Sequence, residues 1–188
     1  MALTNSREVW GGVAIALHWL MALMIIGMLV AGTIMVDWPD DDLETKFRLY
    51  QLHKSFGITL LALTILRLAW RLLQPVPPLP ESAPGWMRVG AGLSHMLLYG
   101  LMLAIPVAGW LMASASPLGI PTQIFGLFTL PHLVAASEPA EALYKAIHYW
   151  LGNALILLLV VHVAAALKHH FVDRDAVLVR MLGRRERA

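Results

Sequence analysis

The chain has 188 residues, of which 59% are hydrophobic and 14% are charged, and its formal net charge is +2. Because a soluble domain usually carries about a quarter charged residues, this composition indicates a membrane protein, and the small net charge gives no reason to expect a nucleic-acid partner. The chain has no cysteine, which excludes thiolate-ligated iron, iron–sulfur clusters, covalently attached haem and disulfides.

Four apolar segments reach the roughly 20 residues that a membrane-spanning helix needs. They cover about residues 11–36, 49–73, 89–113 and 146–167, and none of them contains aspartate or glutamate. The longest connection, residues 114–141, is rich in proline and glycine and is expected to hold a short surface turn. We predict an all-α membrane protein in which residues 1–188 form one domain, an up-down bundle of four transmembrane helices.

Basic residues predict the orientation of this bundle, because Lys and Arg accumulate on the cytoplasmic side of membrane segments. The side with both termini and the second connection holds ten of them: Arg7, Arg67, Arg71, Arg88, Lys168, Arg174, Arg180, Arg184, Arg185 and Arg187. The other side holds four: Lys46, Arg48, Lys54 and Lys145. This difference predicts that both termini lie in the cytoplasm.

The fourth segment carries two histidines that predict the kind of site. His148 and His162 are 14 residues apart. In a helix that spacing is about 21 Å along the axis and about 40° around it, so both imidazoles leave one face near opposite membrane surfaces. An imidazole in hydrocarbon is costly unless something binds it, and two on one face therefore indicate two stacked cofactors.

The remaining membrane histidines fall at the same two depths. His53 lies near the outer end of its segment, as His148 does, whereas His18 and His95 lie near inner ends, as His162 does. A b-type haem takes two axial imidazoles, normally from different helices. We therefore predict His53 and His148 as the ligands of an outer haem iron, with three candidates for an inner one.

The residue one turn beyond each histidine favours His18 over His95 as the inner ligand. A flat macrocycle needs a small side chain there, and four histidines have one: Ala22 after His18, Gly57 after His53, Gly152 after His148 and Ala166 after His162. Tyr99 stands at that position after His95, which we expect to contact a ligand or a neighbouring helix rather than an iron. His132, in the long connection, is predicted to be a solvated loop residue.

Four basic side chains are candidates for contacts with haem propionates or a quinone. Arg67 lies a turn deeper than Arg71, where an unpaired guanidinium is costly, so a propionate is its expected partner. Arg71 fits such a contact or simple anchoring at the inner surface. Lys54 is a candidate on the outer side, or extends to the lipid head groups. His169 follows an inner ligand by seven residues on nearly the same face and is either such a contact or exposed at the interface.

Several short motifs together resemble a known family. They are HW at His18–Trp19, HKSFG at His53–Gly57, RLAWR before a proline-rich connection, IPVAGW at Ile105–Trp110, and VHVAAALKHHF followed by Asp175, Leu178, Arg180 and Met181. In this order and spacing, from about Trp10 to Met181, they resemble the prokaryotic cytochrome b561 family. The resemblance implies a four-helix inner-membrane protein with two b haems, whose irons are bound by His18 and His162 on the inner side and by His53 and His148 on the outer side.

The resemblance also implies a reaction. Similar members oxidise periplasmic superoxide and pass the electron to ubiquinone, which predicts an oxidoreductase that accepts superoxide or another small electron donor. Other relatives serve as haem subunits, so a non-catalytic electron conduit for a separate dehydrogenase is the alternative. A metal or proton transporter is a third class, but such carriers usually pair histidine with intramembrane carboxylates, which these four segments lack.

Overall fold

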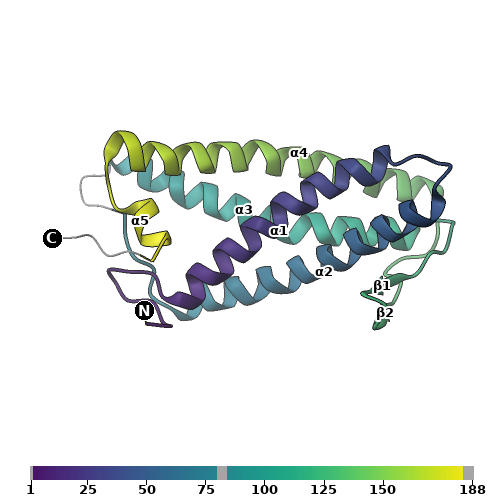
Figure 1. Ribbon diagram of the computed structural model, residues 1–188, viewed down its shortest axis with the longest axis horizontal. Coiled ribbons are helices and arrows are strands. Elements are labelled where there is room, and N and C mark those ends of the chain that lie inside the picture. Colours follow the sequence, from purple (N-terminus) through teal and green to yellow (C-terminus); the bar gives the residue numbers. More distant parts are fainter. Residues whose placement is uncertain (1, 80–83, 184–188) are drawn as a thin grey trace. The chain divides into compact units, whose positions relative to one another are not determined.

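The computed structural model of the chain describes residues 2–79 and 84–183. These residues are mostly helical and include four helices long and apolar enough to cross a membrane. The four are α1 (Gly12–Asp37), α2 (Leu43–Leu73), α3 (Gly85–Ala115) and α4 (Glu138–Lys168). A π-helical turn, η1 (His169–Asp173), continues α4, and a short helix, α5 (Val177–Met181), follows it (Figure 1).

Each predicted apolar segment corresponds to one of these helices, but three helices begin earlier than the apolar run does. Helix α2 begins at Leu43, where the Asp42 carboxylate accepts the Thr45 N–H at 3.1 Å and caps the first turn. Helix α4 likewise begins with a polar turn at Glu138. The apolar run therefore predicts the part of a helix that suits hydrocarbon, and polar first turns extend α2 and α4 beyond that part. Arg184, Arg185 and Arg187, three of the basic residues used to predict the orientation, lie outside the described residues.

The chain forms two compact units, each of which contains part of all four long helices. Unit 1 comprises Met1–Leu20, Ile65–Gly100 and Ala154–Ala188, and unit 2 comprises Met21–Thr64 and Leu101–Asn153. In unit 1, buried Asn5 accepts the Gly11 N–H at 2.9 Å and donates to the Pro75 carbonyl at 3.0 Å. The Trp19 indole donates to the Met181 carbonyl at 2.8 Å, which ties α1 to α5.

Unit 2 contains a β-hairpin where the sequence predicts only a short surface turn. Strand β1 (Thr122–Ile124) pairs antiparallel with β2 (Phe128–Leu130). The turn is closed by a hydrogen bond from the Leu127 N–H to the Ile124 carbonyl at 2.9 Å. Phe125 and Gly126, its two central residues, have φ values of 49° and 71°, as a type I′ hairpin turn requires. Among the described residues, these two strands are the departure from the all-α prediction.

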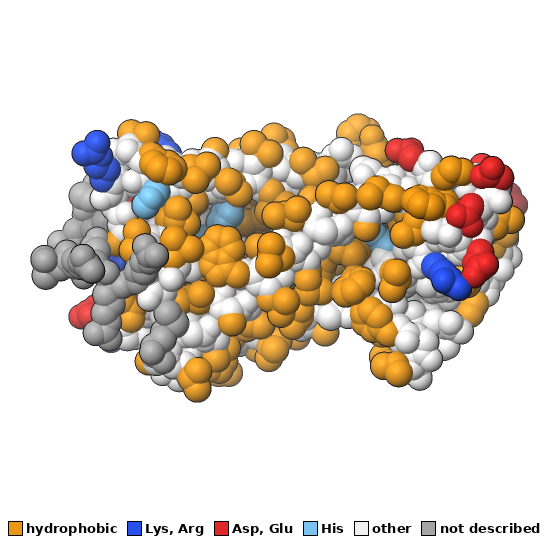
Figure 2. Space-filling model, in the orientation of Figure 1, with side chains coloured by type: hydrophobic (Ala, Val, Ile, Leu, Met, Phe, Trp, Pro, Cys, Tyr) orange, Lys and Arg blue, Asp and Glu red, His pale blue; other side chains and the backbone are white. Residues whose placement is uncertain are grey.

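The long helices turn large apolar side chains outward. Examples that are more than half exposed occur on each of the four helices: Leu23, Ile65, Leu97 and Leu157. Figure 2 shows hydrophobic side chains over the visible faces of the helices. Hydroxyl groups within α2 are satisfied by the helix itself, since Thr59 and Thr64 donate to carbonyls four residues earlier. Both features suit a hydrocarbon environment, in which exposed polar groups are costly.

Candidate functional site

Unit 2 brings two of the predicted ligands together. His53 projects from α2 and His148 from α4, and their ring centres are 6.3 Å apart. Nδ1 of His148 lies 2.9 Å from the Ile105 carbonyl of α3. Because a carbonyl only accepts, Nδ1 carries the ring proton and Nε2 presents its lone pair. Nδ1 of His53 is buried and has no hydrogen-bond partner among the described residues.

Glycines make room for both imidazoles of this pair. A Cβ atom added to Gly109 of α3 would lie 3.1 Å from Cε1 of His148, and one added to Gly32 of α1 would lie 3.5 Å from Cε1 of His53. By contrast, a Cβ atom at Gly152, one turn beyond His148, would meet nothing within 4 Å. The rings are thus closely packed on their helix-facing sides, and open space lies beside α4.

Unit 1 brings three imidazoles together, from α1, α3 and α4. The ring centre of His162 lies 6.3 Å from that of His18 and 5.7 Å from that of His95. Both therefore lie against His162. The separation from His18 equals that of the pair in unit 2, whereas His95 meets His162 edge to face in a closer contact.

Arg67 binds one of these imidazoles. Its Nη2 lies 2.9 Å from Nδ1 of His18, and its Nε donates to the Tyr99 hydroxyl at 3.2 Å. Because a guanidinium only donates, Nδ1 of His18 accepts and the neutral ring keeps its proton on Nε2. A metal at Nε2 would require either loss of that proton beside the guanidinium or a shift of Arg67 to another acceptor, such as a propionate. Arg71 lies close enough to His95 for its charge to act on that imidazole.

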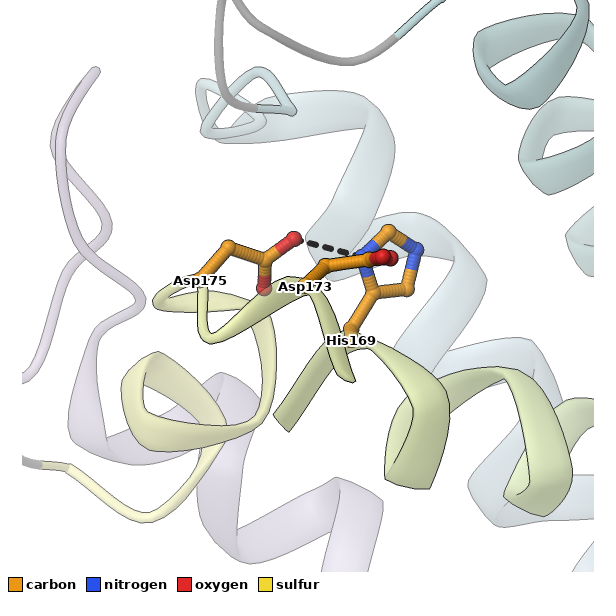
Figure 3. A group of neighbouring side chains, drawn as sticks. All are labelled: His169, Asp173 and Asp175. Atoms are coloured by element: carbon orange, nitrogen blue, oxygen red, sulfur yellow. Dashed lines mark hydrogen bonds and ion pairs between the residues drawn. The ribbon is translucent and has the colours of Figure 1, made fainter. Parts of the chain in front are cut away.

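His169 belongs to a polar group at the end of α4, drawn in Figure 3. Its Nδ1 lies 2.5 Å from Oδ2 of Asp175 and 3.5 Å from Oδ2 of Asp173. The three residues offer ligand atoms within 4.8 Å of one another, a spacing that a metal ion could bridge. However, the Lys168 ammonium lies 2.7 Å from both Asp173 oxygens, and Asp175 also accepts the Val177 N–H at 3.0 Å. The two carboxylates are therefore already engaged, and Asp175 serves to orient His169.

Basic residues of unit 2 bind two kinds of partner, a backbone carbonyl and carboxylates. The Lys54 ammonium donates to the Pro121 carbonyl at 3.0 Å, before strand β1. Two others form ion pairs with carboxylates: Lys46 with Asp40 at 2.5 Å and Arg48 with Glu44 at 2.6 Å. The hydrogen bond from Lys46 lowers the pKa of Asp40, so this carboxylate keeps its charge and continues to balance the lysine. The Pro121 carbonyl is neutral, so this contact does not balance the positive charge of Lys54.

Comparison with known proteins gives the family. The family described as prokaryotic cytochrome b561 matches residues 9–184. Cytochrome b561 homolog 2 of Escherichia coli K12 is 38% identical over 185 residues, covering 98% of this chain and 96% of the relative. A Yersinia pestis protein named probable superoxide oxidase CybB is 33% identical over 176 residues, covering 89% and 92%. The chain belongs to the prokaryotic cytochrome b561 family. It is a membrane b-type cytochrome of that family, which includes oxidoreductases.

The histidine pairs of this cytochrome b561 fit a b-type haem. A histidine nitrogen binds a metal at about 2.0–2.1 Å, and its ring centre lies about 1 Å farther, so two axial imidazoles stand roughly 6 Å apart. His53 and His148 meet this requirement at 6.3 Å, as do His18 and His162. The unpartnered nitrogen of His53 and the open space beside Gly152 also fit a bound group in unit 2.

We expect Gly109→Ala to reduce haem binding by this cytochrome, and Gly109→Val to reduce it further. The added Cβ atom would lie 3.1 Å from the His148 ring, which must then move by a few tenths of an ångström. Gly100→Ala is the matched control, since its Cβ atom on the same helix would meet nothing within 4 Å. Alanine favours a helix over glycine by about 1 kcal/mol, so a weaker helix cannot explain the loss. Haem per polypeptide from a pyridine haemochromogen assay is the measurement. Equal haem in the Gly109 and Gly100 variants would contradict the placement of His148.

Three contacts of the site were not predicted from the sequence. The Ile105 carbonyl and Gly109 both lie in the motif IPVAGW, where a glycine inside an apolar helix indicates a close approach of another group. Asp175 follows His169 by six residues, and only the fold of η1 shows that they meet. The Trp70 indole N–H is also buried, without a hydrogen-bond partner among the described residues.

Proposed function

We propose that this cytochrome is a di-haem b oxidoreductase of the bacterial inner membrane, with both termini in the cytoplasm. It takes electrons from superoxide, or another small reductant, at the periplasmic side and passes them to ubiquinone. The observation that carries this proposal is the repeated geometry, a pair of imidazoles 6.3 Å apart in each unit. The relative named probable superoxide oxidase supports superoxide as the donor. Bound haem would supply the one-electron chemistry that side chains alone cannot.

On the outer side, His53 and His148 would hold the iron, and the Ile105 carbonyl keeps the proton of His148 on Nδ1, which leaves Nε2 with a lone pair for a metal. Lys54 follows His53 on α2, and its hydrogen-bond partner is the neutral Pro121 carbonyl, which leaves its positive charge unbalanced at that contact. Positive potential near a site raises the encounter rate of an anion such as superoxide, and the effect weakens with salt. Each superoxide gives up one electron and leaves as dioxygen.

On the inner side, His18 and His162 would hold the iron, and His95 supports the His162 ring through their edge-to-face contact. His169 donates its Nδ1–H to Asp175, which leaves a lone pair on Nε2 that can accept a hydrogen bond from a quinol hydroxyl. The buried Trp70 N–H in the same unit has no hydrogen-bond partner among the described residues and can donate to a quinone carbonyl. Ubiquinone takes up two electrons, from two superoxide anions, together with two protons, and becomes ubiquinol.

The first test of this function uses the purified wild-type protein. A pyridine haemochromogen assay should return two b haems per polypeptide, since there are two imidazole pairs. A steady supply of superoxide with a soluble ubiquinone should then yield one quinol for two superoxide anions. One haem per chain would defeat the two-site proposal. Two haems without quinol formation would retain the cytochrome and reject its donor or acceptor.

A further inference from the structure

The connection between α3 and α4 has an unusual composition for a segment in water. From Ser114 to Ser137 it contains no Asp, Glu, Lys or Arg. A water-exposed segment of this length would be expected to carry roughly six charges at the usual frequency of about a quarter. Its titratable side chain is His132, which is exposed after β2. The composition of this connection therefore matches that of the membrane helices more closely than that of an aqueous loop.

Hydrogen bonds hold the hairpin of this connection beside α2, not beyond its end. The Ser55 hydroxyl accepts the Phe125 N–H and lies 3.0 Å from the Gln123 carbonyl, and Gln51 donates to the Pro121 carbonyl. Helix α2 continues outward from these contacts for about 12 Å at 1.5 Å per residue, through a turn that carries Glu44, Lys46 and Arg48. Figure 1 likewise shows β1 and β2 at the side of the first turns of α2.

The tip of the hairpin presents apolar side chains outward. Leu127 is 81% exposed, Phe128 55% and Phe125 45%. Figure 2 shows hydrophobic side chains protruding where the hairpin lies. Phe125 occupies a turn position with φ of 49°, which asparagine or glycine adopts more readily, so the backbone gives no reason for phenylalanine there. Its ring instead meets Phe56 of α2 edge to face at 5.1 Å, and Phe56 itself faces outward.

From these observations we infer that the hairpin is a membrane-inserted element. Its tip, Phe125 to Phe128, lies among the lipid acyl chains of the leaflet nearest His53, alongside the apolar surface of α2. The charged first turn of α2 then lies at the head groups, farther from the bilayer centre than the hairpin. The occupant of this apolar surface is lipid, because the tip continues the lipid-facing surface of the helix to which it is bonded. This inference uses the membrane position of α2 and is independent of the electron donor.

Site-directed spin labelling tests this inference directly, because the chain has no native cysteine to compete for the label. The haem-loaded protein with Leu127→Cys or Phe128→Cys is labelled, reconstituted into phosphatidylcholine and phosphatidylglycerol vesicles, and exposed to oxygen or to a water-soluble nickel chelate. Asp41→Cys, in the exposed connection before α2, serves as the aqueous reference. Leu157→Cys, 69% exposed on α4, serves as the lipid-facing reference.

We expect both hairpin labels to collide several-fold more often with oxygen than with the nickel chelate, as the label at 157 does. Nickel accessibility equal to that at position 41 would place the tip in water and overturn the inference. Low accessibility to both reagents, with an immobilised label, would show that protein covers the tip and would overturn it equally. A dipolar interaction between labels of two molecules would identify that protein as a second copy. Haem content measured on the same samples separates this result from any failure of the proposed function.

Discussion

Replacing His53 or His148 by alanine should leave the purified protein with one b haem instead of two, and replacing His18 or His162 should do the same at the other site. Each imidazole lies 6.3 Å from its partner, so the loss of either ring leaves the iron with one axial ligand and a cavity on the other face. The measurements are haem per polypeptide and the reduced-minus-oxidised spectrum. The two classes of variant should lose different components of the α band.

His95→Ala is the informative control for this experiment. His95 lies closer to His162 than His18 does, so the distance alone makes it a competitor for the inner iron. In our assignment its removal retains both haems and only shifts the inner component, since the His162 ring loses a neighbour. If His95→Ala lost a haem while His18→Ala retained both, His95 would be the inner ligand and the assignment would be wrong.

Stopped-flow kinetics should show that superoxide reacts at one site and ubiquinone at the other. The His18→Ala protein should still be reduced rapidly by superoxide but be reoxidised poorly by ubiquinone, because its outer pair is intact and its inner pair is not. The His53→Ala protein should hardly react with superoxide. Reduction of the His18→Ala protein should also slow as salt increases, by up to about tenfold, because Lys54 attracts the anion electrostatically.

Two outcomes would revise this mechanism. If the two variants exchanged behaviours, the donor and acceptor sites would have to be exchanged as well. If neither variant nor the wild type reacted with superoxide, while dithionite reduced all of them, the electron-conduit alternative would gain support. His132→Ala is a suitable control, since this exposed histidine lies outside both imidazole pairs.

The helical fold could be predicted from the sequence because a helix that crosses hydrocarbon must be long and apolar. Long apolar runs without carboxylates predicted four membrane helices, and the described part of the chain contains four helices long and apolar enough to cross a membrane. The two layers of histidine could also be predicted, because His148 and His162 belong to one helix, and the regular geometry of a helix fixes their separation along its axis. The helix ends were harder to predict, because polar first turns extend α2 and α4 beyond the apolar runs.

Contacts between helices were beyond the reach of the sequence. The hydrogen bond between the His148 ring and the Ile105 carbonyl could not be predicted from the sequence. Every residue has a backbone carbonyl, so no residue type marks the one that accepts a hydrogen bond. The contacts of Arg67 with His18 and Tyr99 were likewise not predicted, and its expected contact with a propionate stays a prediction. The hairpin was missed because two strands of three residues each depend on the turn at Phe125 and on anchoring to α2.

The contrasting hydrogen bonds of the two histidine pairs have a thermodynamic consequence. A carbonyl that accepts from His148 would make the imidazole a stronger electron donor to a bound haem and would lower its reduction potential. The guanidinium beside His18 would stabilise an added electron instead and would raise the potential of a haem at that site, by an amount on the order of tens of millivolts. Electrons entering on the outer side would then run downhill to the inner side. The direction of electron transfer between the two sites would then follow from the groups that lie against their histidines, a backbone carbonyl at His148 and a guanidinium at His18.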